Sequence, residues 1–527
     1  MLYLGASPIN DGAWDVVILL NGGWRIVSGQ IPYVTFHPPV GPLIYLLVAF
    51  GMKVVGPSTA AIPLGTVLLA GCLLPWAWSI AAPRFPPFLA FVYTLFSGFL
   101  LIAPRPLGLG IRETSYAMIY NREGDVLISM LFILLFLPRL KQAYDKPIFE
   151  GLSIGFLLAL ILYCKVTYFI VACASVPLGV VSSRPSWKWL WSIAAGFIGI
   201  GLVAFLLFRI GLWAYIRDVM SSGHAQSMAM RMQLLKYDVV VNLPWLYLIF
   251  VCLMLWTFID KASGRILLSA AGSWLIAAWP IGVSVGLDAG NTGGRVDNPL
   301  FFISALIPLE GFRRRHREQM QLPRSSPCLV QLATYMIILP HFCFQILFQD
   351  ASAFAYANGW DLLKRSSFDT SRQLHARPLR DLRVPPGGTL IGAYWYIRDF
   401  PDKLNDGLDL LRKHLSGDDR VTTFGYVDPF SFAFGLKPCR DINLWWDLNQ
   451  NFTINVHPAP DEFLGSATLV MVPIPDSRYS SAASETLDAM MKLYKPYLQE
   501  NFELVDTSQA WLLYRRRSAS PEGVHPN

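Results

Sequence analysis

The sequence predicts a polytopic α-helical membrane protein with a C-terminal soluble α/β domain. Of its 527 residues, 54% are hydrophobic and only 15% are charged, whereas about 25% are charged in an ordinary globular domain. The apolar residues fall in blocks long enough to cross a bilayer, which takes about 20 residues of helix. These blocks stop near residue 350, after which the composition is that of a soluble domain. A water-soluble fold of this size could not cover its surface with so few charges.

The apolar residues form ten segments, and each is expected to be a membrane-spanning helix. They cover about residues 59–81, 86–103, 125–138, 149–164, 166–182, 189–209, 239–259, 266–286, 299–312 and 329–349. The predicted transmembrane domain is therefore 59–349. It follows a first outer loop at 1–58 and precedes the soluble domain at 350–527.

Lysine and arginine residues gather in alternate loops between these segments. The basic loops contain Arg84; Arg139, Lys141 and Lys146; Arg184 and Lys188; Lys261 and Arg265; and the stretch from Arg313 to Arg324. The positive-inside rule assigns these loops to the cytoplasm, so residues 1–58 and the C-terminal domain should be extracytoplasmic at a plasma (inner) membrane. The densest basic cluster adjoins an apolar span, so topology explains the net charge of +7 and no nucleic-acid partner is expected.

Residues 1–58 must be translocated under this topology, yet only Met1 to Leu4 precede the first polar stretch. We therefore expect that a preceding transmembrane helix is missing or truncated. The segment 41–56 does not replace it, because a crossing there would invert every later loop against the charge pattern. This short segment is expected to lie at the membrane interface.

The apolar stretch from Ile148 to Val181 must cross the membrane twice to join two basic loops. Its interruption is Tyr163-Cys164-Lys165-Val166-Thr167. The stretch therefore predicts a helical hairpin with Lys165 at its tip. An ammonium between two apolar arms is unfavourable unless it faces polar groups, which makes Lys165 a candidate functional residue. The alternative is a lysine that extends to the outer interface.

The C-terminal domain shows helix and strand patterns. Helices are expected at 402–415 and 485–498, and strands at 421–426 and 467–472, followed by a hairpin of 502–505 with 510–514. These elements predict an α/β domain.

The first outer loop carries an ordered set of motifs. Asp11 and Asp15 come first, followed by Gly29-Gln-Ile-Pro32-Tyr33 and Phe36-His37-Pro38-Pro39. In this order the residues resemble the GT-C superfamily of membrane glycosyltransferases, especially bacterial enzymes related to the protein O-mannosyltransferases and aminoarabinose transferases. The acidic run Tyr120 to Asp125 and Lys165 extend the resemblance more loosely.

The resemblance implies a GT-C-type hexosyl or pentosyl transferase that takes a sugar from a polyprenyl-phosphate donor in the lipid bilayer. The acceptor, a lipid, glycan or protein hydroxyl, is not specified by any motif. Such a reaction needs a carboxylate to accept the proton of the acceptor and cations to stabilise the leaving phosphate. The family pattern favours Asp15 over Asp11 as the base.

Other polar residues are candidates for the substrate and phosphate site. They are Lys165, His37, Arg112, Arg122, Glu123 and Asp125. Glu123 or Asp125 could position the acceptor or a divalent cation, although no metal ligand set is identified. Each acid also has a structural alternative, because Asp11, Asp15, Glu123 and Asp125 lie where helix N-terminal caps are expected. His37 lies before two prolines and is equally well explained as part of a rigid turn.

Other functions also fit parts of the pattern. A transporter or flippase of a lipid-linked sugar would also place a lysine and acids beside lipid, but it would usually show repeated halves, which are not found. A polymerase or ligase of surface polysaccharide would differ mainly in its reaction partners. A non-enzymatic scaffold would have no reason to collect these acids and the His-Pro-Pro sequence in its outer loops.

Overall fold

The computed structural model describes most of the chain up to residue 250 and most of the C-terminal domain. The described residues are 7–8, 13–111, 114–140, 147–183, 186–224, 232–241, 243, 246–247, 250, 278–287, 299–304, 306–307, 310, 347–357, 373–383, 395, 399–476 and 482–517. The predicted spans at 239–259, 266–286, 299–312 and 329–349 lie wholly or partly outside these residues.

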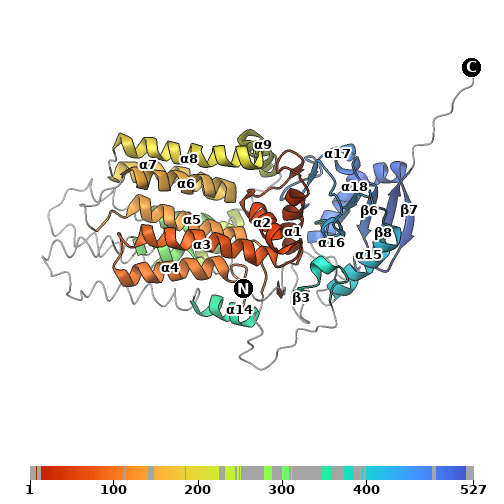
Figure 1. The fold of residues 1–527 in the computed structure, drawn as a ribbon, viewed down its shortest axis with the longest axis horizontal. Coiled ribbons are helices and arrows are strands. Elements are labelled where there is room, and N and C mark those ends of the chain that lie inside the picture. Colours follow the sequence, from red (N-terminus) through yellow and green to blue (C-terminus); the bar gives the residue numbers. More distant parts are fainter. Residues whose placement is uncertain are drawn as a thin grey trace, which may run out of the picture.

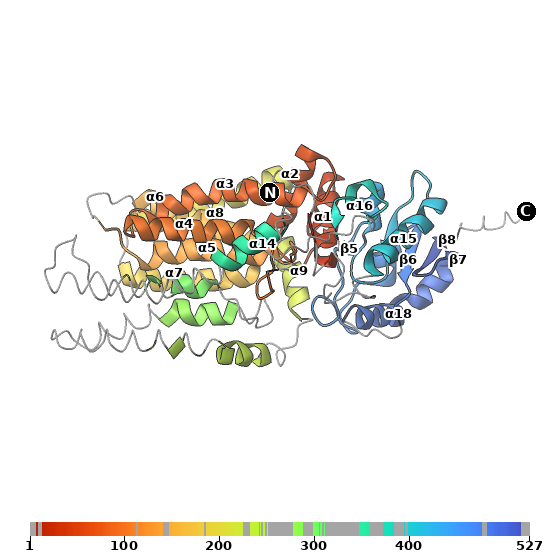
Figure 2. The same cartoon turned by 90° about the horizontal axis from the view of Figure 1, so that it is seen from below.

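The molecule is elongated, with a helical bundle at one end and the C-terminal domain at the other (Figures 1 and 2). The main bundle helices are α3 (Ala61–Ala81), α4 (Pro87–Ile102), α5 (Ile119–Phe136), α6 (Pro147–Cys164), α7 (Val166–Ser183) and α8 (Trp187–Phe208). They match the first six predicted segments, and α5 begins six residues earlier than expected. Helices α1 (Ala13–Val27) and α2 (Leu43–Val55) lie between the bundle and the C-terminal domain.

Three of the described helices are long and apolar enough to cross a membrane: α3, α6 and α8. Helix α8 is the most apolar of them, and large side chains such as Trp191, Ile198 and Leu206 are exposed along it. Helix α5 is different because it is buried on every face from Asn121 to Phe136. It therefore forms the centre of the bundle, where its polar residues are surrounded by protein.

The loops of the bundle lie at two opposite ends. At the end away from the C-terminal domain, Glu150 accepts hydrogen bonds from Arg84 and from Arg139 (2.6 Å from its Nε), which belong to two of the predicted cytoplasmic loops. The loop after α4 and the tip between α6 and α7 lie at the other end, near α2 (Figure 1). This alternation agrees with the charge pattern. The compartment that each end faces stays a prediction.

The C-terminal domain contains a four-stranded sheet in the order β4-β6-β8-β7. Its strands are β4 (Val421–Thr423), β6 (Leu469–Pro473), β7 (Phe502–Thr507) and β8 (Trp511–Arg516), with β4 parallel to β6 and the other pairs antiparallel. Helices α15 (Phe400–His414) and α18 (Ala482–Asn501) accompany the sheet. Every helix and strand predicted for this domain is present, with shifted ends. Short helices α16 (Phe430–Phe434) and α17 (Pro460–Leu464) add to the core.

The segment predicted to be the first outer loop, called the first loop below, is docked onto the C-terminal domain through a buried polar network. The Arg25 side chain donates to the Cys439 carbonyl at 2.6 Å, and Asn21 donates to the Asp428 carbonyl at 2.7 Å. Trp24 and Gln30 donate to the carbonyls of Leu436 and Pro438. Because donors and acceptors are buried together, each partner would be left unsatisfied without the other.

Two short strand pairs reinforce this docking. Strand β1 (Ser7–Pro8) pairs in parallel with β3 (Leu382–Arg383), and β2 (Phe36–His37) pairs in parallel with β5 (Ile442–Asn443). The first loop and the C-terminal domain therefore lie on the same side of any membrane that the bundle crosses.

Replacing Arg25 by methionine should weaken this docking. The change keeps an unbranched side chain but removes the donor of the Asn21 and Gln30 side-chain oxygens, and it leaves the Cys439 carbonyl with only its weaker bond from Gln30 at 3.1 Å. Leaving a buried acceptor without its donor typically costs about 1–3 kcal/mol, so the unfolding temperature of the purified protein should fall clearly.

Arg412→Met is the matched control for this measurement. Arg412 makes an exposed ion pair with Asp409, and such pairs contribute about 0–1 kcal/mol. If Arg25→Met had the same unfolding temperature as the parent and as Arg412→Met, the role of Arg25 in docking the first loop would be contradicted.

Candidate functional site

Polar residues converge where the bundle, the first loop and the C-terminal domain meet. Helix α1 supplies Asp15, α2 supplies Tyr45, and the first turn of α5 supplies Tyr120. The tip between α6 and α7 supplies Lys165, and the C-terminal domain supplies Tyr426. Five separate parts of the chain therefore contribute to one candidate site.

Asp15 stands among three tyrosines. It lies in the first turn of α1 and is partly buried. Burial raises the pKa of Tyr45 and of Tyr426, and the nearby negative charge of Asp15 raises both further. Asp15 also acts electrostatically on Tyr120. A partly buried carboxylate near several tyrosines can act as a general base, and its first-turn position also suits a stabilising role at the helix end.

Lys165 lies beside one of these tyrosines. Its Nζ donates a hydrogen bond to Asn121 Oδ1 at 3.0 Å and lies 5.2 Å from the centroid of the Tyr120 ring. Helix α6 ends at Cys164 and α7 begins at Val166, so the predicted break of the apolar stretch is confirmed. The structure thus brings Asp15 and Lys165, both singled out from the sequence, near the same residue, Tyr120.

The first loop holds the hairpin tip in place through Gly41. A Cβ atom on Gly41 would lie 2.1 Å from the carbonyl oxygen of Tyr163 and 2.5 Å from that of Cys164. Only glycine permits this approach of one backbone to another. The Gly-Pro turn of the first loop therefore fixes the position of the residue next to Lys165.

Glu123 and Asp125 lie inside α5, not at its cap. The helix begins at Ile119, so both acids fall in later turns, and the N-terminal cap alternative is wrong for them. Asp125 accepts a hydrogen bond from the Tyr168 hydroxyl at 2.7 Å. Both carboxyl oxygens of Glu123 are buried and have no hydrogen-bond partner among the described residues. The two acids therefore lie in the protein interior, next to the hairpin tip.

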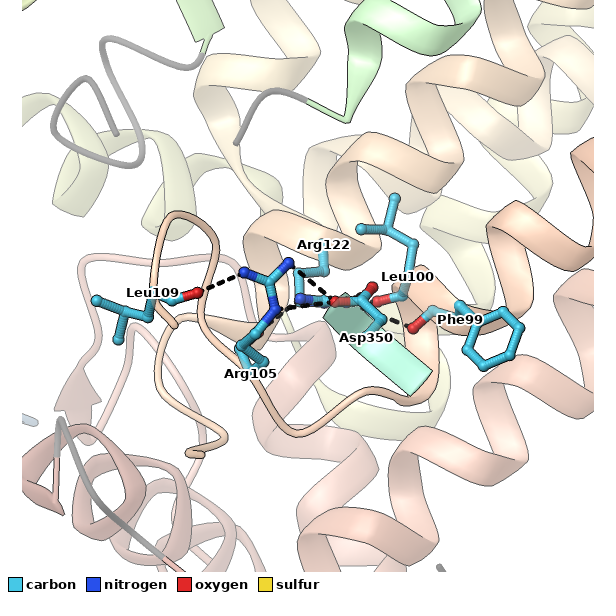
Figure 3. Close-up of polar contacts among 6 residues, drawn as sticks. All are labelled: Phe99, Leu100, Arg105, Leu109, Arg122 and Asp350. Atoms are coloured by element: carbon cyan, nitrogen blue, oxygen red, sulfur yellow. Dashed lines mark hydrogen bonds and ion pairs between the residues drawn. The ribbon is translucent and has the colours of Figure 1, made fainter. Parts of the chain in front are cut away.

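Arg122 was expected near a phosphate, and the structure surrounds it with protein acceptors instead. Its guanidinium donates to the carbonyls of Leu100 and Arg105 and to Asp350 (Figure 3). Arg105 donates to the other carboxylate oxygen of Asp350 at 3.0 Å. Asp350 lies on α14 (Gln349–Ala357). These contacts account for the buried charge of Arg122 without a ligand, and they attach α14 to the bundle.

His37 also has a protein partner. Its Nδ1 lies 2.6 Å from Asp218 Oδ2 on α9 (Leu212–His224), a helix between two of the predicted apolar segments. This contact supports the alternative that His37 has a structural role in its turn. Asp11 and Arg112 lie outside the described residues, so their predicted roles stay predictions.

The C-terminal domain adds residues that the sequence analysis did not identify. The Tyr426 hydroxyl donates to Asp447 at 3.2 Å, and the Tyr426 ring packs against Trp445 with centroids 5.7 Å apart. Burial raises the pKa of Asp447 to about 6. No local sequence pattern marks these residues, because only the docking of the domain brings them near Asp15.

Within the described ranges, no three histidine, cysteine or acidic side chains are grouped so that they could hold a metal ion. The sequence matches no family model, and no curated protein or solved structure is significantly similar to it. The function of the site is therefore argued from its own residues and contacts.

Replacing Gly41 by alanine should displace the hairpin tip, because the new methyl group would overlap two backbone carbonyls. We expect a lower unfolding temperature and a loss of whatever activity depends on Lys165. Gly71→Ala is the control, since a Cβ atom there meets nothing within 4 Å and alanine favours a helix. Equal melting of the Gly41 and Gly71 variants would show that the tip does not need this close approach.

Asp447→Asn should change the pH dependence of stability. The folded pKa of about 6 lies above the ordinary aspartate pKa of 3.8, so ionisation of Asp447 disfavours the folded state. The parent should lose stability as pH rises from about 4 to 6, by at most about 3 kcal/mol. The asparagine keeps an acceptor for Tyr426, so this variant should melt higher than the parent at pH 7.5 and equally at pH 4. If the difference in unfolding temperature between variant and parent were the same at both pH values, the raised pKa of Asp447 would be contradicted.

Proposed function

We propose that this chain is a multi-pass membrane glycosyltransferase of the GT-C type, with its C-terminal domain on the extracytoplasmic side. It would move a sugar from a polyprenyl-phosphate donor to the hydroxyl group of a lipid, glycan or protein. The observation that carries the proposal is the placement of Asp15 and Lys165 around Tyr120, at the end of a bundle with membrane-length helices.

The proposed chemistry uses the two groups in different roles. The acceptor oxygen attacks the anomeric carbon of the sugar while Asp15 takes the hydroxyl proton. The bond between that carbon and the phosphate oxygen breaks, and its electron pair leaves with the polyprenyl phosphate. The Lys165 ammonium stabilises the negative charge that develops on this leaving group.

The surroundings of the two residues support these roles. The hairpin places Lys165 at the tip of α6, one of the helices long enough to cross a membrane, where the phosphate of a lipid donor would lie. The C-terminal domain covers the same end through Tyr426 and Trp445. Tyrosine and tryptophan side chains are suited to contact a sugar, because each combines an apolar ring with a hydrogen-bonding group.

Asp15→Asn tests the proposed base. Asparagine keeps the size of the side chain but cannot accept the proton, so sugar transfer should fall by roughly 10² or more. The assay follows labelled sugar from a polyprenyl-phosphate donor in membranes that hold matched amounts of each variant. Asp402→Asn, an exposed change in the C-terminal domain, is the control and should leave transfer unchanged.

Three results would count against this assignment. Equal transfer by Asp15→Asn and the parent would remove Asp15 from the mechanism. Loss in Asp11→Asn alone would exchange the roles of the two acids. Movement of the donor across the membrane with its sugar–phosphate bond intact would favour the transporter alternative.

A further inference from the structure

Helix α9 has two faces of different character. Tyr215 and Asp218 are buried on its inner face, while Leu212, Trp213, Ile216 and Met220 are exposed on its outer face. Trp213 is 78% exposed and Met220 is 59% exposed. Their spacing of three to four residues forms one apolar stripe along the helix. An outer face of this kind needs a partner that removes it from water.

The inner face of α9 is held firmly in one orientation. The Tyr215 hydroxyl donates to the Leu162 carbonyl at 2.7 Å, at the end of α6. The Tyr215 ring packs against Tyr33 of the first loop, with centroids 4.7 Å apart. The contact between His37 and Asp218 adds a third attachment. The helix therefore cannot rotate to bury its outer face without losing all three contacts.

The outer face continues the exposed apolar surface of α8. Helix α8 ends at Phe208, and only three residues separate it from Leu212. Phe205, Leu206 and Leu207 are exposed at the end of α8, as expected for a membrane-length helix that faces lipid. Helix α9 lies at the end of the bundle nearest the C-terminal domain (Figures 1 and 2). Its apolar stripe therefore begins where the surface of α8 reaches the edge of a bilayer.

We propose that α9 is a membrane-interface helix whose outer face lies in the lipid leaflet nearest the C-terminal domain. Trp213 suits this depth because tryptophan is enriched at membrane interfaces. Arg209 and Arg217 are exposed, Arg217 with 65% of its side chain, and can extend to the phosphate groups of the lipids. The occupant of this surface is the bilayer itself.

The proposed contact has a structural consequence for the candidate site. The inner face of α9 binds Leu162, three residues before Lys165, and His37, four residues before the Gly41 that contacts the hairpin tip. Lipid contact by α9 therefore sets the height of Lys165 relative to the bilayer surface. This inference depends on the bundle crossing a membrane and does not depend on sugar transfer.

Site-specific fluorescence in lipid nanodiscs tests the proposal. The seven cysteines are first replaced in the full chain, and a bimane probe is attached to Trp213→Cys. A matched probe is placed on Val456→Cys, which is exposed in the C-terminal domain. Two quenchers are compared, a lipid spin-labelled close to its headgroup and aqueous iodide.

The proposal predicts blue-shifted emission at position 213, with quenching by the spin-labelled lipid and weak quenching by iodide. The probe at 456 should show emission typical of water and strong quenching by iodide alone. Met220→Cys repeats the test if the Trp213 variant fails to fold. Iodide quenching equal to that at 456 would overturn the proposal. Shielding of position 213 from both quenchers would also overturn it, and would indicate that protein covers this face.

Discussion

The buried hydrogen bonds from α1 to the C-terminal domain are the interaction on which the arrangement of the candidate site depends. Asn21, Trp24 and Arg25 lie on one helix and donate to backbone carbonyls between residues 428 and 439. That segment lies between Tyr426 and Asp447 in the sequence. The contact of this segment with α1 therefore places Tyr426 close to Asp15. Asp15 lies on the same helix as the anchoring residues, a few turns before them.

The first loop connects this docking to the bundle. One part of the loop, α1 with β2, binds the C-terminal domain. The turn of the loop at Gly41 contacts the tip of the α6–α7 hairpin. Fewer than thirty residues of chain therefore contact both the C-terminal domain and the hairpin tip that carries Lys165. The candidate site therefore combines a lysine from the tip of a helical hairpin with residues of the C-terminal domain.

Features with a local pattern could be predicted from the sequence. Hydropathy located α3 to α8, the break at Lys165 and the elements of the C-terminal domain, because each rests on periodicity or segment length. The start of α5 was placed too late, since its charged residues are buried in protein and hydropathy treats them as outside the membrane. Lys165 could be selected because a lysine between two apolar arms is unusual, and Asp15 because of its place in the ordered motifs of the first loop.

Features that depend on distant residues could not be predicted. The contact of Arg105 and Arg122 with Asp350 joins positions more than 200 residues apart, and no single residue of the three marks it. The two-residue strands of the first loop are too short to give an alternating pattern. Asp447 becomes part of the site only after the domain docks, and α9 is a short helix whose two faces become distinct only against α6 and the first loop.

The most direct test of the central claim is a double-mutant cycle on sugar transfer with Asp15→Asn and Lys165→Met. If both residues serve one transfer step at one site, the double variant should be far more active than the product of the two single losses predicts. All four proteins are assayed with the same polyprenyl-phosphate donor at matched amounts in membranes. Losses that multiply independently, or a Lys165→Met protein with full activity, would contradict the claim that the two residues form one active site.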